Sequence, residues 1–170
     1  MSASASLSVQ VPVLSSQRLI LREPRLADFD SYAEFSASPR AGFVGGPMDR
    51  AQAWRRFAAS LGHWILRGFG LWTIEDKATG AVAGRTGLIL HEGWPETELG
   101  WQIYDGFEGQ GYAHEAATLA RDHAIRVMGL PPMISLIAPA NSRSRRLAER
   151  MGAHIEREAE VTGIPCLIYR

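Results

Sequence analysis

The sequence predicts a mixed α/β fold in a single domain, and three observations lead to that prediction. The chain has 170 residues, enough to bury about two-thirds of its unfolded surface in one core. Apolar residues make up 46% of it and charged residues 21%, as in globular proteins. Its strand-like and helix-like segments follow the order β-α-α-β-β-β-α-β-α-β-β. No linker or repeat divides this series, so we expect one domain over residues 17–170, after a loose tail over residues 1–16.

The first part of the chain contains one predicted strand and two predicted helices. Residues 18–23, RLILRE, form a short apolar-rich strand candidate, and residues 24–38 follow with helical spacing. The apolar positions of this helix are Leu26, Phe29, Ala33 and either Phe35 or Tyr32. Asp49 is placed to cap a second helix over residues 50–68. The stripe predicted for the second helix consists of Trp54, Phe57, Leu61 and Ile65.

The rest of the chain predicts an antiparallel meander followed by alternating helices and strands. Three strand-like segments separated by turn residues occupy residues 70–76, 81–91 and 96–104. Further along, helices are predicted from Tyr112 to Met128 and from Ser142 to Met151, with Gly152 ending the second. Strands are expected at residues 133–138, 154–160 and 166–170.

Composition excludes several classes of protein. The 18 acidic side chains balance 18 basic ones, which gives no bias toward nucleic acid or membrane surfaces. Lys77 is the only lysine and lies in a turn-like segment, which argues against Schiff-base chemistry. Cys166 is the only cysteine, so a disulfide framework and a Cys-rich zinc site are excluded. The five histidines lack metal-ligand spacing, and we expect a cytoplasmic protein without a bound metal.

The segment GFEGQGYAHE, residues 106–115, places three glycines directly before a helix. Free N–H groups at a helix N-terminus carry partial positive charge, so this arrangement is typical of a phosphate site. It is not the dinucleotide fingerprint, because His114 stands at the third glycine position, and the sequence contains no P-loop. An alternative interpretation is a turn whose glycines adopt positive φ, followed by alanines that allow close helix packing.

A second motif, ANSRSRRLAERMGA, follows the strand at residues 133–138. Asn141 is placed to cap its helix and Ser144 lies in the first turn, although an ordinary N-cap explains Asn141 equally well. Together the two motifs resemble those of the GNAT superfamily of acetyl-coenzyme A-dependent N-acetyltransferases. The resemblance runs from about Arg18 to the end of the chain. It is closest to the Rim-type acetyltransferases, which modify the N-terminal alanine of ribosomal proteins.

This resemblance implies a mostly antiparallel central sheet of six to seven strands, flanked by about four helices. The strands at residues 96–104 and 133–138 would splay apart, and the pantetheine arm of acetyl-coenzyme A would lie between them. The residues that it assigns to the cofactor are Trp101, Gln102, Ile103, Gly109, Gln110, Gly111, Tyr112, Ala113, Asn141, Arg143 and Arg146. Arg145 is a further candidate for steering the phosphates, although an arginine-rich helix face is often only solvated. Glu108 departs from the family's loop pattern.

The resemblance also implies catalytic roles for Glu98, Ser144 and Asn141. Ser144 would donate a proton to the departing thiolate, and Asn141 would hold the pantetheine arm. Glu98 is the best-placed base, directly or through water, and the alternative for it is a solvated acid at a strand end. Lesser candidates for the base are Glu92 and His91. Four tryptophans and Phe43 form either an acceptor pocket or plain core: Trp64, Trp72, Trp94 and Trp101.

The function that we expect is transfer of the acetyl group of acetyl-coenzyme A to a primary amine, which is a protein N-terminus or a small molecule. Cys166 lies far along the chain from both motifs, which favours direct attack over a covalent acyl-enzyme. The alternative is a non-catalytic acyl-coenzyme A-binding module or regulator. A nucleotide hydrolase is a third hypothesis, disfavoured by the missing P-loop lysine. We expect a monomer or homodimer that binds neither nucleic acid nor membranes.

Overall fold

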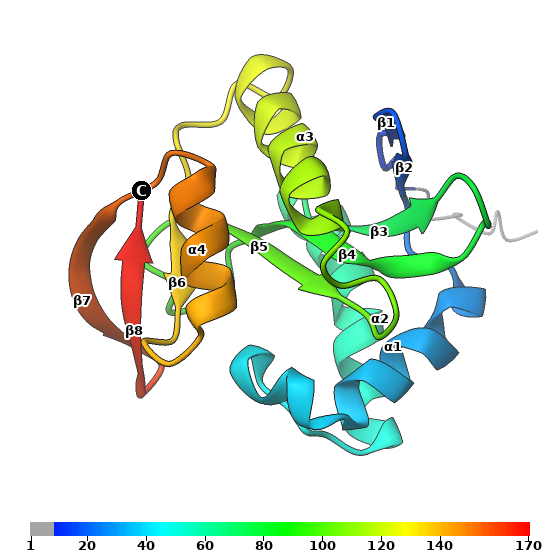
Figure 1. Ribbon diagram of the computed structural model, residues 1–170, viewed down its shortest axis with the longest axis horizontal. Helices are drawn as coiled ribbons and strands as arrows, with labels where there is room; N and C mark the ends of the chain where they lie inside the picture. Colours follow the sequence, from blue (N-terminus) through cyan, green and yellow to red (C-terminus); the bar gives the residue numbers. More distant parts are fainter. Residues whose placement is uncertain (1–8) are drawn as a thin grey trace, which may run out of the picture.

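The computed structural model describes residues 9–170 and confirms the predicted α/β fold class (Figure 1). Its α-helices are α1 (Phe29–Ala37), α2 (Arg50–Arg67), α3 (Tyr112–Arg126) and α4 (Ser142–Arg150), and its 3-10 helices are η1 (Leu26–Asp28) and η2 (Pro39–Val44). Its strands are β1 (Leu14–Ser15), β2 (Leu19–Arg22), β3 (Leu71–Asp76), β4 (Val82–Ile89), β5 (Glu98–Ile103), β6 (Ser135–Ile137), β7 (Ile155–Val161) and β8 (Ile164–Tyr169).

Strand β1 falls inside the range that the sequence assigned to a loose tail. Leu14 pairs with Leu21 of β2, and the indole N–H of Trp72 donates to the carbonyl of Pro12 at 2.8 Å. The tail boundary at residue 16 therefore needs correction, because backbone pairing and a core tryptophan hold this segment to the sheet. Residues 1–8 of the predicted tail lie outside the described residues.

The strands form two sheets where one was expected. Strands β1 to β5 make an antiparallel sheet in chain order, and the second sheet has the order β6-β8-β7. The two meet at one point, where the N–H of Leu99 donates to Ile134 O at 2.8 Å and the N–H of Ile134 donates to Thr97 O at 3.1 Å. Beyond this contact no backbone pairing joins β5 to β6 within residues 9–170. The predicted splayed pair is therefore present, and it opens far enough to divide the sheet.

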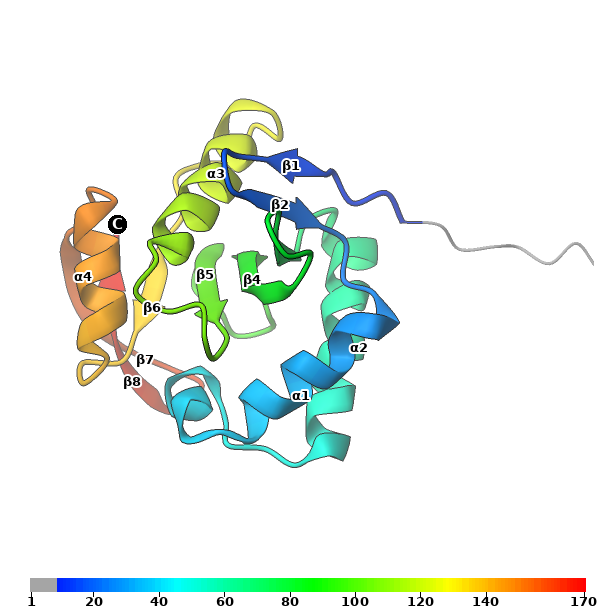
Figure 2. The same cartoon turned by 45° about the vertical axis from the view of Figure 1, so that its right-hand side comes forward.

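Helices cover both faces of the five-stranded sheet. Figure 2 shows α1 and α2 on one face, α3 on the other, and α4 against the second sheet. The contact face of α3 consists of fully buried alanines, which let the helix axis approach the strands closely: Ala116, Ala117, Ala120 and Ala124. None of the helices in residues 9–170 combines the length and apolarity needed to cross a membrane.

Helix α2 begins as predicted but buries a different stripe. The carboxylate of Asp49 accepts a hydrogen bond from the N–H of Gln52 at 2.8 Å, which caps the helix. Trp54 and Ile65, two members of the predicted stripe, are each 46% exposed. The buried positions are Ala53, Phe57, Ser60 and Trp64. This face is selected because Trp64 packs edge-on against Trp72 of β3, with ring centroids 4.8 Å apart.

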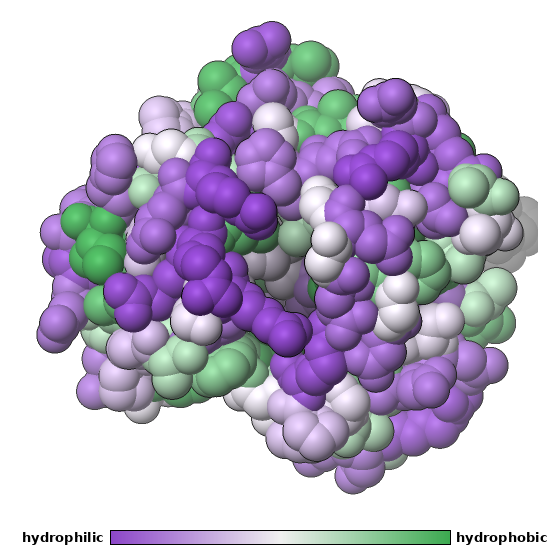
Figure 3. All heavy atoms as spheres, viewed as in Figure 1, coloured by the Kyte–Doolittle hydropathy of each residue, from purple (hydrophilic) through white to green (hydrophobic). Residues whose placement is uncertain are grey.

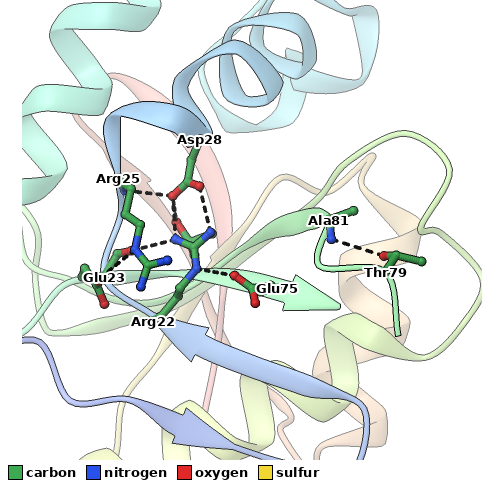
Figure 4. A network of polar contacts seen from close by, with 8 residues as sticks. Arg22, Glu23, Arg25, Asp28, Glu75, Thr79 and Ala81 are labelled. Carbon is green, nitrogen blue, oxygen red and sulfur yellow. Dashed lines mark hydrogen bonds and ion pairs between the residues drawn. The ribbon is translucent and has the colours of Figure 1, made fainter. Parts of the chain in front are cut away.

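A buried polar network joins the first helical segment to the sheet (Figure 4). Both terminal nitrogens of Arg22 donate to the carboxylate of Asp28, at 2.9 and 2.8 Å, and Arg22 Nε donates to Glu75 at 2.5 Å. Asp28 also accepts from the N–H of Arg25 and the hydroxyl of Thr73. Desolvation opposes ionisation of Asp28, but these donors outweigh it and lower its pKa. The network fixes how α1 sits over β2 and β3.

Replacing Asp28 with asparagine is expected to destabilise the fold by about 3 kcal/mol, because it leaves the buried Arg22 with one carboxylate instead of two. The depressed pKa of Asp28 makes its contribution complete above the pKa of the unfolded chain, near 4. That contribution is lost as the pH falls through the folded-state value. Urea unfolding of both proteins at pH 7 and at acidic pH measures this, and the difference between them should shrink in acid.

The matched control is Glu23→Gln, which removes the partner of Arg25 in a more exposed ion pair. This change should alter stability by less than about 0.5 kcal/mol. Equal effects of the two substitutions would contradict the assignment of Asp28 as a structural anchor.

Candidate active site

The glycine loop and the N-terminus of α3 present a series of backbone N–H groups. Gly109 and Gly111 have φ of 73° and 80°, and Gly111 is the N-cap of α3. At position 109 glycine is favoured by the positive φ and not by crowding, since a Cβ there would meet nothing within 4 Å. The N–H groups of residues 109–113 have no hydrogen-bond acceptor among residues 9–170. Both interpretations of the motif therefore hold: the glycines make the turn, and the turn presents free donors.

The carboxylate of Glu108, which departs from the family's loop pattern, is turned back onto the loop. It accepts a hydrogen bond from the N–H of Gly106 at 2.7 Å, and it lies 3.0 Å from a terminal nitrogen of Arg40. Arg40 also donates to the carbonyl of Ile103 at 2.9 Å. The negative charge beside the loop is therefore partly compensated by the protein itself, and Arg40 fastens the loop to the end of β5.

A cleft of about 1230 Å³ runs from the loop along the opening between β5 and α4. Figure 3 shows hydrophilic side chains gathered over α4 and a hollow beside them. The predicted cofactor residues that line this cleft are Trp101, Gln102, Ile103, Gly109, Gly111, Tyr112, Ala113, Asn141, Arg143 and Arg146. Gln110 does not line it: its side-chain amide donates to Gly106 O at 3.0 Å and its carbonyl accepts from Arg18.

The arginines of α4 divide into two groups. Arg143 and Arg146 line the cleft, together with Arg150. Arg145 points away from it, with Nε donating to the hydroxyl of Tyr169 at 3.0 Å, and it serves packing against the second sheet. The expectation that all three central arginines steer phosphate is therefore wrong for Arg145. The sequence did not distinguish them because it could not show which side of α4 faces β8.

A hydrogen bond between side chains crosses the opening between the two sheets. The indole N–H of Trp101 donates to the hydroxyl oxygen of Ser144 at 3.2 Å. The N–H of Ser144 donates to the side-chain oxygen of Asn141, also at 3.2 Å, so Asn141 is the N-cap of α4. The hydroxyl hydrogen of Ser144 and the amide nitrogen of Asn141 have no protein acceptor among residues 9–170. Both groups are therefore free to donate to a ligand in the cleft.

A second cavity of about 260 Å³ adjoins the cleft, on the side of the sheet covered by α2. The residues that line both spaces are Phe43, Val44, Trp101, Gln102, Asn141 and Ser144. Of the aromatic residues considered as pocket or core, Phe43, Trp94 and Trp101 line this cavity, whereas Trp64 and Trp72 are 2% and 0% exposed in the core. A ligand in the cleft and a ligand in the cavity would therefore meet at Trp101 and Ser144.

Glu98 lies in this second cavity and not in the cleft. Desolvation raises its pKa, and a hydrogen bond from the indole N–H of Trp94, 2.7 Å from Oε2, offsets part of that rise. A carboxyl group with a raised pKa is a better proton acceptor near neutral pH than a solvated one. Glu98 lies three residues from Trp101 on β5, about 10 Å along the strand, so a proton from a ligand at the junction would reach Glu98 through more than one water.

The other candidates for the base differ in their surroundings. His91 lines the cavity, and its pKa is lowered by desolvation and by neighbouring cations, so its ring is neutral at physiological pH. Glu92 does not line the cavity. His63 also lines it, but its Nδ1 lies 2.6 Å from Phe69 O and its Nε2 accepts from the N–H of Leu90 at 3.0 Å. Both ring nitrogens of His63 are occupied by the backbone, so its role is to hold α2 to the sheet.

Cys166 is closer to the site than its place in the sequence suggests. It lines the same cavity as Glu98 and Ser144 and is 7% exposed. Desolvation and the charge of Glu98 raise the pKa of its thiol, which keeps it protonated. Cys166 is therefore not kept from the site by its distance along the chain. The protonated state of its thiol is what disfavours it as a nucleophile.

Sequence reasoning missed Arg85, which lines the second cavity from the middle of β4. The available signal was a charged residue inside a strand-like segment, flanked by Gly84 and Gly87. The positive φ of both glycines, 153° and 147°, marks a distorted strand at this point. Chain distortion beside a buried charge is often associated with a functional site.

The fold and the site together indicate a class of enzyme: an α/β fold with a split sheet, a glycine turn that leads into a helix, and a cleft bordered by arginines. The acetyltransferase (GNAT) domain model matches residues 18–154. The chain belongs to the GNAT family, and it is an acetyl-coenzyme A-dependent acyltransferase.

Similar proteins agree with this assignment. The chain is 38% identical to an acetyltransferase from Agrobacterium tumefaciens, with a TM-score of 0.88 and 98% of each chain covered. It is 33% identical over 104 residues to the uncharacterised protein YkkB of Bacillus subtilis, and the match spans 60% of each chain. The ribosomal-protein-S5-alanine acetyltransferase of Vibrio fischeri shares the fold, with a TM-score of 0.72 at 14% identity over 94% of this chain and 95% of that one. A Rim-like relationship is thus confirmed at the level of fold.

Acetyl-coenzyme A is expected to raise the melting temperature, since a ligand bound only by the folded protein stabilises it by about 2.7 kcal/mol at a hundred times its Kd. Replacing Arg143 and Arg146 together by glutamine should weaken binding roughly 10-fold, with the larger effect at low salt. Thermal shift and calorimetric titration measure both effects. Arg157→Gln, on the exposed β7, is the control and should bind as tightly as wild type. Unchanged affinity in the double variant would remove these arginines from the cofactor site.

Proposed function

We propose that this protein acetylates a primary amine by direct attack of the amine on acetyl-coenzyme A. The observation that carries the proposal is the junction at Trp101 and Ser144, where a cleft with free anion-binding donors meets a separate cavity containing a carboxylate. The first space suits the cofactor and the second suits the acceptor. Their shared wall brings the two reactants together without a covalent carrier.

When bound, acetyl-coenzyme A supplies a thioester whose acetyl carbon bonds to the amine nitrogen while the carbon–sulfur bond breaks and a thiolate leaves. Ser144 is placed to donate its hydroxyl proton to that thiolate while regaining one from water, because Trp101 already occupies one of its acceptor positions. Asn141 has a free amide N–H₂ with which to orient the ligand, since its oxygen caps α4. The loop over residues 109–113 would hold the diphosphate through backbone donors.

The amine must lose a proton to react. An α-amine with a pKa of about 8 is roughly one-tenth neutral at pH 7, whereas a lysine side chain with a pKa of about 10.4 is neutral less than once in a thousand. Glu98, with its raised pKa, accepts that proton through water in our proposal. An α-amine needs less of this help than a lysine side chain does.

A covalent route through Cys166 is disfavoured by chemistry. A thiol attacks as its thiolate, and the pKa of Cys166 is raised by burial and by the charge of Glu98. Direct attack is the remaining route at this site. Incubation with acetyl-coenzyme A alone should leave the intact mass of the protein unchanged, and an acetylated Cys166 would contradict direct attack.

The alternative that the sequence left open, a non-catalytic acyl-coenzyme A-binding module, is disfavoured by the site. The acceptor cavity and the free Ser144 hydroxyl favour the enzyme, since binding alone requires neither. Thiol release from acetyl-coenzyme A, measured against a panel of amino acids, peptides and simple amines, separates the two. Tight cofactor binding without release above the uncatalysed rate for any amine would favour the binding module.

Ser144→Ala is expected to lower kcat about 10-fold or more while leaving the Kd for acetyl-coenzyme A nearly unchanged, because donation to the thiolate matters mainly in the transition state. It also leaves the indole N–H of Trp101 without an acceptor, so a loss of stability of about 1–2 kcal/mol should accompany it. Ser142→Ala, which lies beside the cleft but outside the cavity, is the control. An unchanged kcat for Ser144→Ala would assign protonation of the thiolate to water.

Glu98→Gln is expected to reduce the rate by roughly 10²- to 10⁴-fold if Glu98 is the base. The loss should be greatest between the raised pKa of Glu98 and the pKa of the amine. Below the first value wild-type Glu98 is itself protonated, and above the second the amine is already neutral, so the two proteins converge on both sides. A pH–rate profile with the same shape in both proteins would show that Glu98 is only a buried acid.

A further inference from the structure

Arg85 is a buried cation without a counter-ion. Its residue exposure is 8%, its Nε has no hydrogen-bond partner, and it takes part in none of the ion pairs within residues 9–170. Its guanidinium carbon lies 4.4 Å from the ring centre of Tyr32, which covers one of its faces. The residue lines the acceptor cavity and not the cofactor cleft.

The contrast with Arg22 shows how unusual this is. Arg22, 6% exposed, is held by two carboxylates and a carbonyl on the same face of the same sheet. The nearby acid Asp28 is fully engaged by Arg22 and other donors. Burying a charge without a partner is costly, so a protein that keeps one at a cavity wall is prepared for an anion from outside.

Gln102 provides a matching unsatisfied acceptor. It pairs directly with Arg85 across β4 and β5, so the two side chains project from the same face about 5 Å apart at their Cβ atoms. Its side-chain oxygen is buried and accepts no hydrogen bond. Gln102 lines both the cavity and the cleft, which places its free oxygen at the junction where the amine must react.

On this face of β5 no side chain lies between Gln102 and Glu98. Gly100 separates Gln102 from Glu98 on this face of β5 and contributes no side chain to the cavity. The only carboxylate of the lining is Glu98, about 13 Å from Gln102 along the strand, whereas the lining carries two arginines, Arg56 and Arg85. The end of the cavity nearest the junction is therefore cationic.

We propose that the acceptor is a small amine with an adjacent carboxylate, as in a free α-amino acid, whose carboxylate binds Arg85 and whose amine donates to the oxygen of Gln102. This inference rests on the proposed function and specifies its substrate class. Arg85 supplies a planar fork that a carboxylate matches, and Gln102 directs the amine toward the junction. A protein N-terminus is a poor match, because its α-carbon bears an amide in place of the carboxylate.

The chemistry balances as before. The amine nitrogen bonds to the acetyl carbon, the carbon–sulfur bond breaks, and the amine proton passes to Glu98 through a chain of waters. The thiolate takes a proton from Ser144 while Ser144 regains one from water, and Glu98 returns its proton to solvent. Arg85 takes no part in these bond changes. It is a positioning residue, so its loss should raise KM far more than it lowers kcat.

The test compares L-amino acids with matched amines that lack the carboxylate charge. The pairs are phenylalanine with 2-phenylethylamine, leucine with isopentylamine and lysine with cadaverine, and phenylalaninamide tests the charge alone. Thiol release gives kcat and KM, and thermal shift in the presence of coenzyme A gives binding independently of turnover. At least one amino acid is expected to exceed its partner by 10-fold or more in kcat/KM.

Arg85→Gln should raise KM for that amino acid by roughly 10- to 100-fold and leave KM for its uncharged partner unchanged. Arg85→Lys should recover part of the loss, since it keeps the charge without the fork. Arg55→Gln, on the exposed side of α2, is the matched control and should behave as wild type. Arg85→Gln should also melt no lower than wild type, because it removes an uncompensated buried charge.

The outcomes distinguish a failure of the amino-acid preference from a failure of amine acetylation itself. Equal acetylation of amino acids and their uncharged partners would overturn the inference and leave amine acetylation standing. If no amine is acetylated, the proposed function fails, and the thermal shift still decides whether carboxylates bind through Arg85. An Arg85→Gln protein that melts lower but keeps the same preference among acceptors would show a purely structural arginine and overturn the inference.

Discussion

The single contact between β5 and β6 is the constraint on which the site depends. Leu99 and Ile134 join the two sheets at one end, and the hydroxyl of Ser135 reinforces the contact by donating to Leu99 O at 2.8 Å. Past this point the strands diverge, so their facing backbone groups remain available and a cleft opens. The side-chain bond from Trp101 to Ser144 crosses that opening. Full pairing of β5 with β6 would close the cleft and remove the junction between the two cavities.

The polar and charged groups of this protein fall into two sets. Those that hold the fold together are paired with one another, whereas several of those around the cleft and the cavity are not. Arg22 and Asp28 satisfy each other and fix α1 on the sheet, while Arg40 pairs with Glu108 beside the glycine loop. Around the cleft and the cavity, by contrast, several groups have no partner among residues 9–170: the N–H groups of residues 109–113, Arg85 Nε and the side-chain oxygen of Gln102. Unsatisfied groups cost stability, and their concentration along one continuous space is consistent with ligands that complete them.

The two halves of this space differ in the segments that form them. The cleft lies between the glycine loop, β5 and α4, all within residues 18–154, which the GNAT domain model matches. The second cavity is lined mainly by η2, α2, β4, β5, β6 and the β7–β8 hairpin, and this hairpin begins where the family match ends, at residue 154. In our proposal the pair Arg85 and Gln102, on β4 and β5, selects the acceptor in this cavity.

The sequence by itself determined the element order from β2 onward, the cap at Asp49 and the glycine turn before α3, because caps, glycine turns and periodicity are local effects of neighbouring residues. The resemblance of its two motifs to those of the GNAT superfamily also predicted the opening between β5 and β6. Prediction from the sequence failed where partners come from distant segments: the buried stripe of α2, the inward turn of Arg145 and the nearness of Cys166 to Glu98. The sequence marked Arg85 only as a charge inside a strand-like segment, since a residue's missing counter-ion is known only when every neighbour has been placed. Long-range packing decides which polar groups are satisfied, and local sequence carries no record of it.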